Sequence, residues 1–279
     1  MSMMKLLTLN THSLVEADYV HKLRDFVTAV CDIRPDIIAL QEVSQSLGAP
    51  VFTGELQGYF PCVSDVTVRE DNHALRAAEM LRQRGSEYYW TWLPIKLGYG
   101  RYNEGIALLS RSPIISAESL HVSRVDDPMN WKTRKLLGVR AQEFPEDWFY
   151  CVHYGWWSDT DEPFSFQWQQ TLSHVHDCGR TWLMGDFNSP ADIRGEGYDL
   201  MLHSGFHDTY TLAERRDSGI TVSGGIDGWH GSQEDKRIDL ILCSEKVDVQ
   251  SSEVVFNGIR LPVVSDHYGV LINVERSSI

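Results

Sequence analysis

Two polar side chains in the segment Gly185-Asp186-Phe187-Asn188 have the types and the spacing to do chemistry at the end of a strand. The apolar residues 182–184 come directly before the segment and a Ser-Pro turn follows it, a pattern typical of a short buried strand. Side chains two residues apart in a strand share a face, so Asp186 and Asn188 would point the same way. A carboxylate there can hold a cation or a proton, and a carboxamide adds a donor and an acceptor. The segment alone fits a site and a simple turn equally well.

Polar residues follow other apolar strands of the chain in the same way. Any single example has an ordinary explanation, such as an Asn that caps a turn, a solvated Glu or a structural His. The recurrence of such ends along one chain is harder to explain by structure alone. They are Asn10, Glu42, His153, Asp186, Asn188, Asp239 and the pair Asp266-His267.

Apolar strands and amphipathic helices are spread over the full length of the chain. This order predicts layered α/β architecture, and the absence of a repeat or linker favours one domain, residues 1–279. A Gly- and Pro-containing loop is expected at 44–70, and loops of that length are often functional. The expected strands are 5–10, 37–43, 88–93, 104–110, 134–144, 147–153, 182–186, 238–242, 247–256 and 268–274, and the expected helices are 17–30, 73–84, 162–177 and 196–203.

Composition and cysteine usage indicate a cytoplasmic protein. The 279 residues are 42% apolar and 23% charged, as in ordinary globular proteins, and no apolar run has the length of a membrane span. The N-terminal residues lack the long apolar region of a signal peptide. The five cysteines are odd in number and none is in a CxxC pair, so neither a disulfide framework nor a zinc site is predicted.

The formal net charge of −14 argues against a nucleic-acid partner, because proteins that bind a nucleic-acid backbone usually present a basic face. The one basic cluster is Lys132-Thr133-Arg134-Lys135. It could face a phosphate group, or it could be a solvated strand end, which is the favoured interpretation for Lys132 and Lys135. No apolar hairpin that would suit membrane phospholipids is present.

Taken together and in order, these motifs resemble the endonuclease/exonuclease/phosphatase superfamily, which has the DNase I-like fold. The resemblance spans almost the whole chain, and it implies a four-layered α/β sandwich of two packed mixed sheets flanked by helices. It also implies metal-dependent cleavage of phosphate esters. The matching pieces are Leu9-Asn10, Gln41-Glu42, 105–111, His153, Gly185-Asp186-Phe187-Asn188, Arg237-Ile238-Asp239 and Ser265-Asp266-His267.

The resemblance implies a role for each motif residue. Mg²⁺, with Mn²⁺ as a possible substitute, suits a phosphoryl group and prefers oxygen ligands. The implied metal ligands are Asn10, Glu42 and Asp266. The implied catalytic residues are His153, Asp186, Asn188, Asp239 and His267. Among them, Asp186 would be the general base, Asp239 would orient His267 and favour its charged form, and His153 would donate to phosphoryl oxygens.

More specific stretches, such as Asn10-Thr11-His12-Ser13 and His153-Tyr154-Gly155-Trp156-Trp157, resemble the bacterial branch that includes maltose 6′-phosphate phosphatase. That likeness implies a Mg²⁺-dependent phosphatase for a sugar phosphate, acting as a monomer on a small phosphorylated sugar. A nuclease or phosphodiesterase of the same fold is the alternative, and a non-enzymatic module is a third. The expected substrate-binding residues are Tyr102, Trp156, Asp227 and Trp229, although a core or turn position remains open for each of them.

Overall fold

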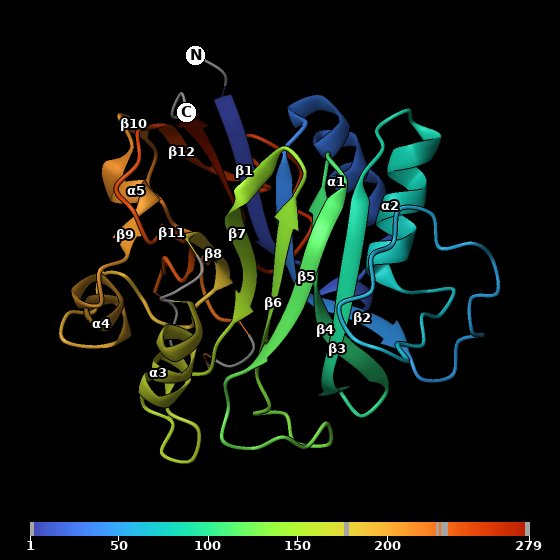
Figure 1. The fold of residues 1–279 in the computed structure, drawn as a ribbon, viewed down its shortest axis with the longest axis horizontal. Helices are drawn as coiled ribbons and strands as arrows, with labels where there is room; N and C mark the ends of the chain where they lie inside the picture. The colour runs from blue at the N-terminus through green and yellow to red at the C-terminus, as the bar shows by residue number, and fades with distance from the viewer. Residues whose placement is uncertain (1–2, 176–178, 227–228, 230–233, 277–279) are drawn as a thin grey trace.

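Two mixed β-sheets lie face to face, with helices covering both outer sides (Figure 1). The computed structural model describes residues 3–175, 179–226, 229 and 234–276. In neighbour order, the first sheet contains β10 (Arg215–Arg216), β12 (Val249–Val255), β13 (Gly269–Glu275), β1 (Met3–Asn10), β2 (Ile37–Ser46), β4 (Tyr102–Ser110) and β3 (Tyr89–Gly98). The second contains β5 (Ile114–His121), β6 (Lys135–Ala141), β7 (Phe144–His153), β8 (Arg180–Asp186), β11 (Asp239–Cys243) and β9 (His207–Asp208).

The helices divide between the two outer faces. Helices α1 (Tyr19–Ile33) and α2 (His73–Gln83) cover the first sheet, and α3 (Phe164–Val175) and α4 (Gly197–His203) cover the second (Figure 1). The short η1 (Ser13–Val15) follows β1, and α5 (Thr209–Leu212) follows β9. The expected four-layered α/β sandwich is therefore confirmed. Within the described ranges, no helix is long and apolar enough to cross a membrane.

Strand β1 explains why the layers stack, because both of its faces are apolar. Leu7 and Leu9 pack with α1 and α2, whereas Met4 and Leu6 pack into the layer between the sheets. This alternation is the period of two that a strand imposes. Burying each such side chain contributes roughly 1.5–3 kcal/mol, so a strand that is apolar on both sides belongs at the centre of the sandwich.

The predicted and observed elements differ mainly at the sheet edges. Strand β5 was not expected, because its residues are mostly half-exposed and include Ser116, Glu118 and Ser119. Strand β3 continues through Pro94 to Gly98, beyond the predicted end at residue 93. Proline lacks a backbone donor, and the position is tolerated because β3 is the edge strand of its sheet.

Candidate active site

Three of the predicted site residues are neighbours through strand register. Asp186 ends β8, where it pairs with His153 at the end of the parallel β7 and with Asp239 at the start of the antiparallel β11. Paired residues on adjacent strands have side chains about 5 Å apart on one face of the sheet. The register alone therefore places one imidazole and two carboxylates in a row at the edge of the second sheet.

Gly185 allows this close approach of the strands. Its φ is +153°, and a Cβ added there would lie 2.0 Å from the carbonyl oxygen of Val152 in β7. No side chain fits in that space, so the glycine before Asp186 is a packing requirement of the β7–β8 pair.

An irregularity in β2 presents Glu42 to the same place from the first sheet. The register between β2 and β4 shifts between Leu40 and Val43, and Glu42 within that shift has a left-handed φ of +54°. A bulge re-aims a side chain and interrupts pairing. The left-handed conformation of a non-glycine residue costs about 1–3 kcal/mol, which the surrounding sheet must offset.

Histidine 267 connects the two carboxylates of the second sheet. Its Nδ1 lies 2.9 Å from Asp239 Oδ2, and its Nε2 lies 3.9 Å from Asp186 Oδ2. His153 approaches the same Asp186 oxygen with Nε2 at 3.6 Å. The two imidazoles therefore flank one carboxylate, and all of these side chains are almost completely buried.

Two asparagines hold Asp186 in place. The backbone N–H of Asn188 donates to Asp186 Oδ1 over 2.9 Å, and Asn188 Nδ2 donates to the Tyr154 carbonyl oxygen over 3.0 Å. Asn10, at the end of β1, uses its Nδ2 to donate to Glu42 Oε1 (2.9 Å) and to Asp186 Oδ2 (3.3 Å). Asn10 thus joins the carboxylates of the two sheets.

The pKa values of the two histidines at this site shift in opposite directions, and the pKa of Asp186 is raised. Burial and the neighbouring Asp239 carboxylate raise the pKa of Asp186 to about 7. Burial lowers the pKa of His267, but the charges of Asp239 and Asp186 outweigh it and raise the pKa to about 10. Burial, Arg134 and Lys96 hold the pKa of His153 well below its ordinary value. At neutral pH, His267 is therefore a cation and His153 is a neutral imidazole.

A cavity of about 510 Å³ opens onto these residues. This volume lies in the range of small-molecule sites. Its lining comprises Glu42, Lys96, Leu97, Gly98, Tyr99, Glu104, Trp131, Arg134, His153, Trp156, Asp186, Asn188 and His267.

Several lining residues were not predicted from the sequence. Lys96 is the one charged residue in β3, and that contrast is the signal that could have indicated it. Its Nζ pairs with Glu104 Oε1 at 3.1 Å. Arg134 belongs to the basic cluster whose orientation the sequence left open, and it lines the cavity. Tyr99 and Trp131 lie in the segments that precede β4 and β6, where periodicity carries no signal.

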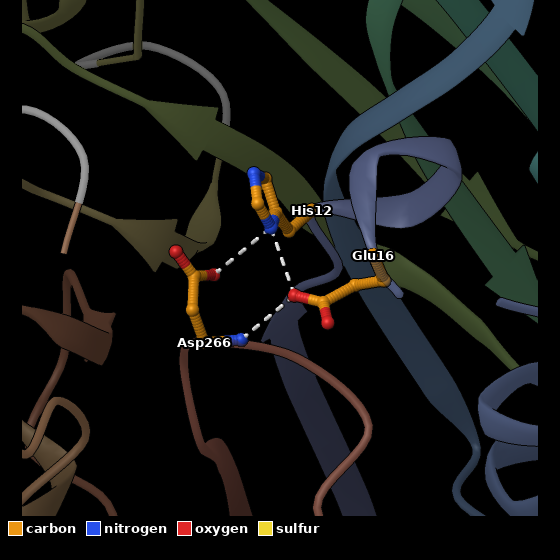
Figure 2. A group of neighbouring side chains, drawn as sticks. All are labelled: His12, Glu16 and Asp266. Atoms are coloured by element: carbon orange, nitrogen blue, oxygen red, sulfur yellow. Dashed lines mark hydrogen bonds and ion pairs between the residues drawn. The ribbon is translucent and has the colours of Figure 1, made fainter. Parts of the chain in front are cut away.

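Asp266 belongs to a separate cluster with His12 and Glu16, and none of the three lines the cavity (Figure 2). Glu16 Oε1 accepts from His12 Nδ1 over 2.8 Å and from the backbone N–H of Asp266 over 3.1 Å. Burial lowers the pKa of His12, yet Glu16 and Asp266 raise it to about 9. Glu16 therefore holds both His12 and the backbone of Asp266, and metal ligation by Asp266 stays a prediction.

The oxygen donors around Glu42 suit a divalent cation. Burial raises the pKa of Glu42, and the charges of Glu104 and Asp266 raise it further. A hard cation would relieve this repulsion and would take oxygen ligands. Glu42 would hold the ion, and the charge of Asp266 also acts on Glu42. Asn10 turns its amide nitrogen toward Glu42, an arrangement that supports Asn10 as the residue that orients Glu42; its direct ligation stays a prediction.

The predicted substrate-binding residues are in different places. Trp156 lines the cavity. Trp229 is half-buried and donates its Nε1 proton to Asn188 Oδ1 over 3.0 Å, so it touches the site without lining the cavity. Tyr102 is buried and donates to the Leu14 carbonyl oxygen over 3.2 Å, away from the cavity lining. Asp227 lies outside the described residues.

The comparisons with known proteins agree with this geometry. Residues 7–267 match the Endonuclease/Exonuclease/phosphatase family. A solved endonuclease/exonuclease/phosphatase family protein from Leptotrichia buccalis is 28% identical, with a TM-score of 0.85 and coverage of 98% of this chain and 100% of that chain. No curated protein matches the chain.

More distant solved structures share the fold. An endonuclease/exonuclease/phosphatase from Beutenbergia cavernae is 18% identical, with a TM-score of 0.71 over 99% of this chain and 72% of that chain. A 3′-5′ exonuclease from Neisseria meningitidis is 19% identical, with a TM-score of 0.63 over 98% of this chain and 100% of that chain. The match over nearly the whole sequence and the shared fold lead to one conclusion: the chain belongs to the endonuclease/exonuclease/phosphatase family of metal-dependent hydrolases.

Proposed function

We propose that the protein is a Mg²⁺-dependent phosphatase that hydrolyses the phosphate monoester of a sugar, with a disaccharide phosphate such as maltose 6′-phosphate as the preferred substrate. Mn²⁺ is expected to substitute for Mg²⁺. The observation that carries the proposal is the presence of two indole rings in the lining of the cavity that holds Asp186, His153 and His267.

The two rings belong to Trp131 and Trp156. Their centroids are 5.8 Å apart and their planes are tilted by 59°. Trp131 is 53% exposed, which is unusual for so large an apolar side chain and fits a ring kept available for a ligand. The Nε1 atom of Trp156 is buried and has no hydrogen-bond partner in the described ranges, so it can donate to a hydroxyl. Apolar faces with a few polar groups suit a sugar. Trp168, by contrast, belongs to α3 and is buried in the core between that helix and the second sheet.

The protein groups divide the chemistry of monoester hydrolysis among themselves. Asp186 is the general base for the attacking water, because a carboxylate with a pKa of about 7 accepts a proton readily near neutral pH. Asn188 orients Asp186 through its backbone N–H. His267, charged and held by Asp239, and the neutral His153 donate to phosphoryl oxygens and stabilise the negative charge of the transition state.

A bound Mg²⁺ at Glu42 would supply further charge neutralisation to the phosphoryl group. Glu42 would hold the ion and Asp266 would approach from the other side of the site. Asn10 keeps Glu42 and Asp186 in fixed relative positions through its two hydrogen bonds.

A nuclease or phosphodiesterase remains the competing function, because the fold is shared with the Neisseria meningitidis exonuclease. The net charge of −14 opposes it, since a polyanionic backbone would be repelled over most of the surface. A small substrate needs only local positive charge. A cytoplasmic, monomeric protein is part of the proposal, and the free state of the four described cysteines supports a reducing compartment.

A substrate panel tests the proposal. Purified protein would be assayed with disaccharide phosphates, hexose phosphates, nucleotides, a phosphodiester and a nicked-plasmid substrate, each with Mg²⁺ and with EDTA. We expect the highest kcat/KM for a disaccharide phosphate and no turnover in EDTA. Trp131→Ala should raise KM for the disaccharide phosphate more than for glycerol phosphate, because glycerol has no ring to stack. Faster cleavage of nucleic acid than of every sugar phosphate would overturn the proposal.

A further inference from the structure

Arg134, in the loop before β6, is a buried cation that makes no close ion pair with a carboxylate of the described residues. Its side chain lines the cavity and only 3% of its surface is exposed. Its Nη1 donates to the carbonyl oxygens of Trp131 (2.8 Å) and Thr133 (3.1 Å). In the described residues, the charges of Glu104, Asp186 and Glu42 act on it without a close ion pair, and its buried Nε has no hydrogen-bond partner. Burial lowers the pKa of Arg134 although the carboxylates raise it, so an oxygen anion that bonds the free edge would stabilise the charged guanidinium.

Lys96 brings a second cation to the same point. Its side chain is 11% exposed, and its Nζ donates to the Trp131 carbonyl oxygen over 3.2 Å while it pairs with Glu104. Because both nitrogens bond one oxygen, they lie within about 6 Å of each other. Burial lowers the pKa of Lys96, and the charge of Arg134 lowers it further. Glu104 makes its close ion pair with Lys96, whereas Arg134 feels Glu104, Asp186 and Glu42 only at longer range and keeps its hydrogen-bonding edge for a ligand.

The unsatisfied edge of Arg134 has a specific chemical complement. Its Nη1 hydrogen bonds are directed at backbone carbonyls, which leaves the Nε and Nη2 side without a protein acceptor in the described ranges. That side of a guanidinium is a planar fork that matches two oxygens of a phosphate. Arg134 and Lys96 line the same cavity as His153 and Asp186, so the two cations share the space where phosphorus would be attacked.

We propose that Arg134, supported by Lys96, is a binding subsite for the non-bridging oxygens of a phosphate monoester dianion and selects monoesters over diesters. The inference rests on the proposed phosphatase function and names what determines its substrate class. A monoester near neutral pH carries a charge of about −1.5 to −2 and three acceptor oxygens. A diester carries a single negative charge and only two non-bridging oxygens, and its second ester group would occupy the space beside the fork.

Binding of inorganic phosphate separates this subsite from turnover. Calorimetry with Mg²⁺ present would compare wild type, Arg134→Gln and Lys96→Gln. Arg140→Gln is the matched control, since Arg140 lies in β6 against Trp148 and does not line the cavity. We expect Arg134→Gln to weaken phosphate binding by at least about 10-fold and Lys96→Gln to weaken it less. Arg140→Gln should bind as wild type does. Phosphate binding by folded Arg134→Gln within about 3-fold of wild type would overturn the inference.

Kinetics provide the second measurement. The kcat/KM of Arg134→Gln should fall at least about 10-fold for a sugar phosphate monoester and less than about 3-fold for the methyl diester of the same sugar phosphate. Equal losses on both substrates would contradict selection by Arg134. If Arg134→Gln does not fold, Arg134→Lys serves instead, because it keeps the charge and loses the planar fork; unchanged phosphate binding in that variant would refute the fork.

The two proposals fail in different ways. If wild type binds inorganic phosphate through Arg134 but hydrolyses no sugar phosphate, the sugar substrate is wrong and the anion subsite is supported. If wild type hydrolyses sugar phosphates and Arg134→Gln matches it in both binding and monoester preference, the phosphatase function is supported and the subsite is wrong.

Discussion

The Nδ1 atom of His267 lies 2.9 Å from Oδ2 of Asp239, and this is the shortest link between the segment before β13 and the second sheet at the site. The other carboxylate oxygen of Asp239 is buried and has no hydrogen-bond partner in the described ranges. The Asp239 side chain is therefore committed to one imidazole. The positive charge of His267 offsets the free-energy cost of burying the Asp239 carboxylate. The Nε2 of the same imidazole lies on the side of Asp186 and the cavity.

Replacing Asp239 by Asn should remove that charge while the shape stays the same. Without the Asp239 carboxylate the pKa of His267 should fall, so the imidazole is no longer a cation at neutral pH. We expect kcat for phosphate-ester hydrolysis to fall by about 10²–10⁴-fold, the usual contribution of a positioned acid or base, with little change in KM. Steady-state kinetics and a histidine NMR titration would measure both effects.

The control for Asp239→Asn is Asp235→Asn, which removes the same formal charge from an exposed residue that accepts a hydrogen bond from Ser223. It should behave as wild type. Retention of more than about a third of kcat by Asp239→Asn would show that the His267–Asp239 pair takes no part in the reaction.

Glu42→Gln should bind a divalent metal ion more weakly, and the metal-free variant should be more stable to unfolding than the metal-free wild type. Burial and the charges of Glu104 and Asp266 raise the pKa of Glu42, so its ionised form is disfavoured in the folded protein. A neutral amide removes that repulsion, so the metal-free variant should unfold at a higher urea concentration at pH 8. Its affinity for Mn²⁺ should fall by at least about 10-fold, because a charged oxygen ligand is gone.

Mn²⁺ affinity by calorimetry and urea unfolding in EDTA would test the two halves separately. Glu55→Gln, at an exposed position in the long loop after β2, should change neither quantity. A Glu42→Gln variant that binds Mn²⁺ as tightly as wild type does would exclude Glu42 as a ligand.

The sequence was sufficient for the parts of the site that strand periodicity determines. Asn10, His153 and Asp186 all end apolar strands, and in a sandwich of parallel and antiparallel strands those ends meet at one edge. The four-layered fold followed from the same motifs taken in order. The distances among these residues depend on strand register, which no local pattern specifies.

The rest of the lining depends on irregularities and on long-range packing. Lys96 reaches the cavity beside a register shift between Pro94 and Lys96, and bulges of this kind leave no signal in residue type. Tyr102 and Tyr99 are three residues apart across the same turn; the structure turns Tyr99 to the cavity and buries Tyr102 against Leu14. Sequence alone could indicate an aromatic residue near the site but not which of the two.

Gly185→Ala should both destabilise the protein and displace Asp186, the proposed general base. The new methyl group would lie 2.0 Å from the Val152 carbonyl oxygen, and neither strand can shift without breaking the β7–β8 register. We expect a loss of roughly 3 kcal/mol or more in the free energy of unfolding. Gly195→Ala is the control, since its φ is also positive at +82° but no atom lies within 4 Å of the added methyl; it should lose only about 1 kcal/mol. Equal losses in urea unfolding would show that the close approach at Gly185 is unimportant.

Buried His73, the first residue of α2, should make the protein less stable in acid. Burial and nearby Arg76 lower the pKa of His73 from 6.5 to about 4, and its buried Nε2 has no partner in the described ranges. The unfolded chain therefore binds a proton that the folded chain does not bind. Protonation of His73 in the unfolded chain therefore leaves the free energy of unfolding unchanged above pH 6.5 and lowers it as the pH falls toward 4.

His73→Gln cannot titrate and can still accept from the Tyr19 hydroxyl, which lies 3.1 Å from His73 Nδ1. Since one pKa unit corresponds to about 1.4 kcal/mol, wild type should lose roughly 3 kcal/mol relative to His73→Gln across that window. Urea unfolding at several pH values would measure the difference, and His21→Gln, at an exposed position on α1, should follow wild type. A constant gap between wild type and His73→Gln from pH 7 to pH 4 would mean that His73 is protonated equally in the folded and unfolded states, because only a difference in bound protons can make stability depend on pH.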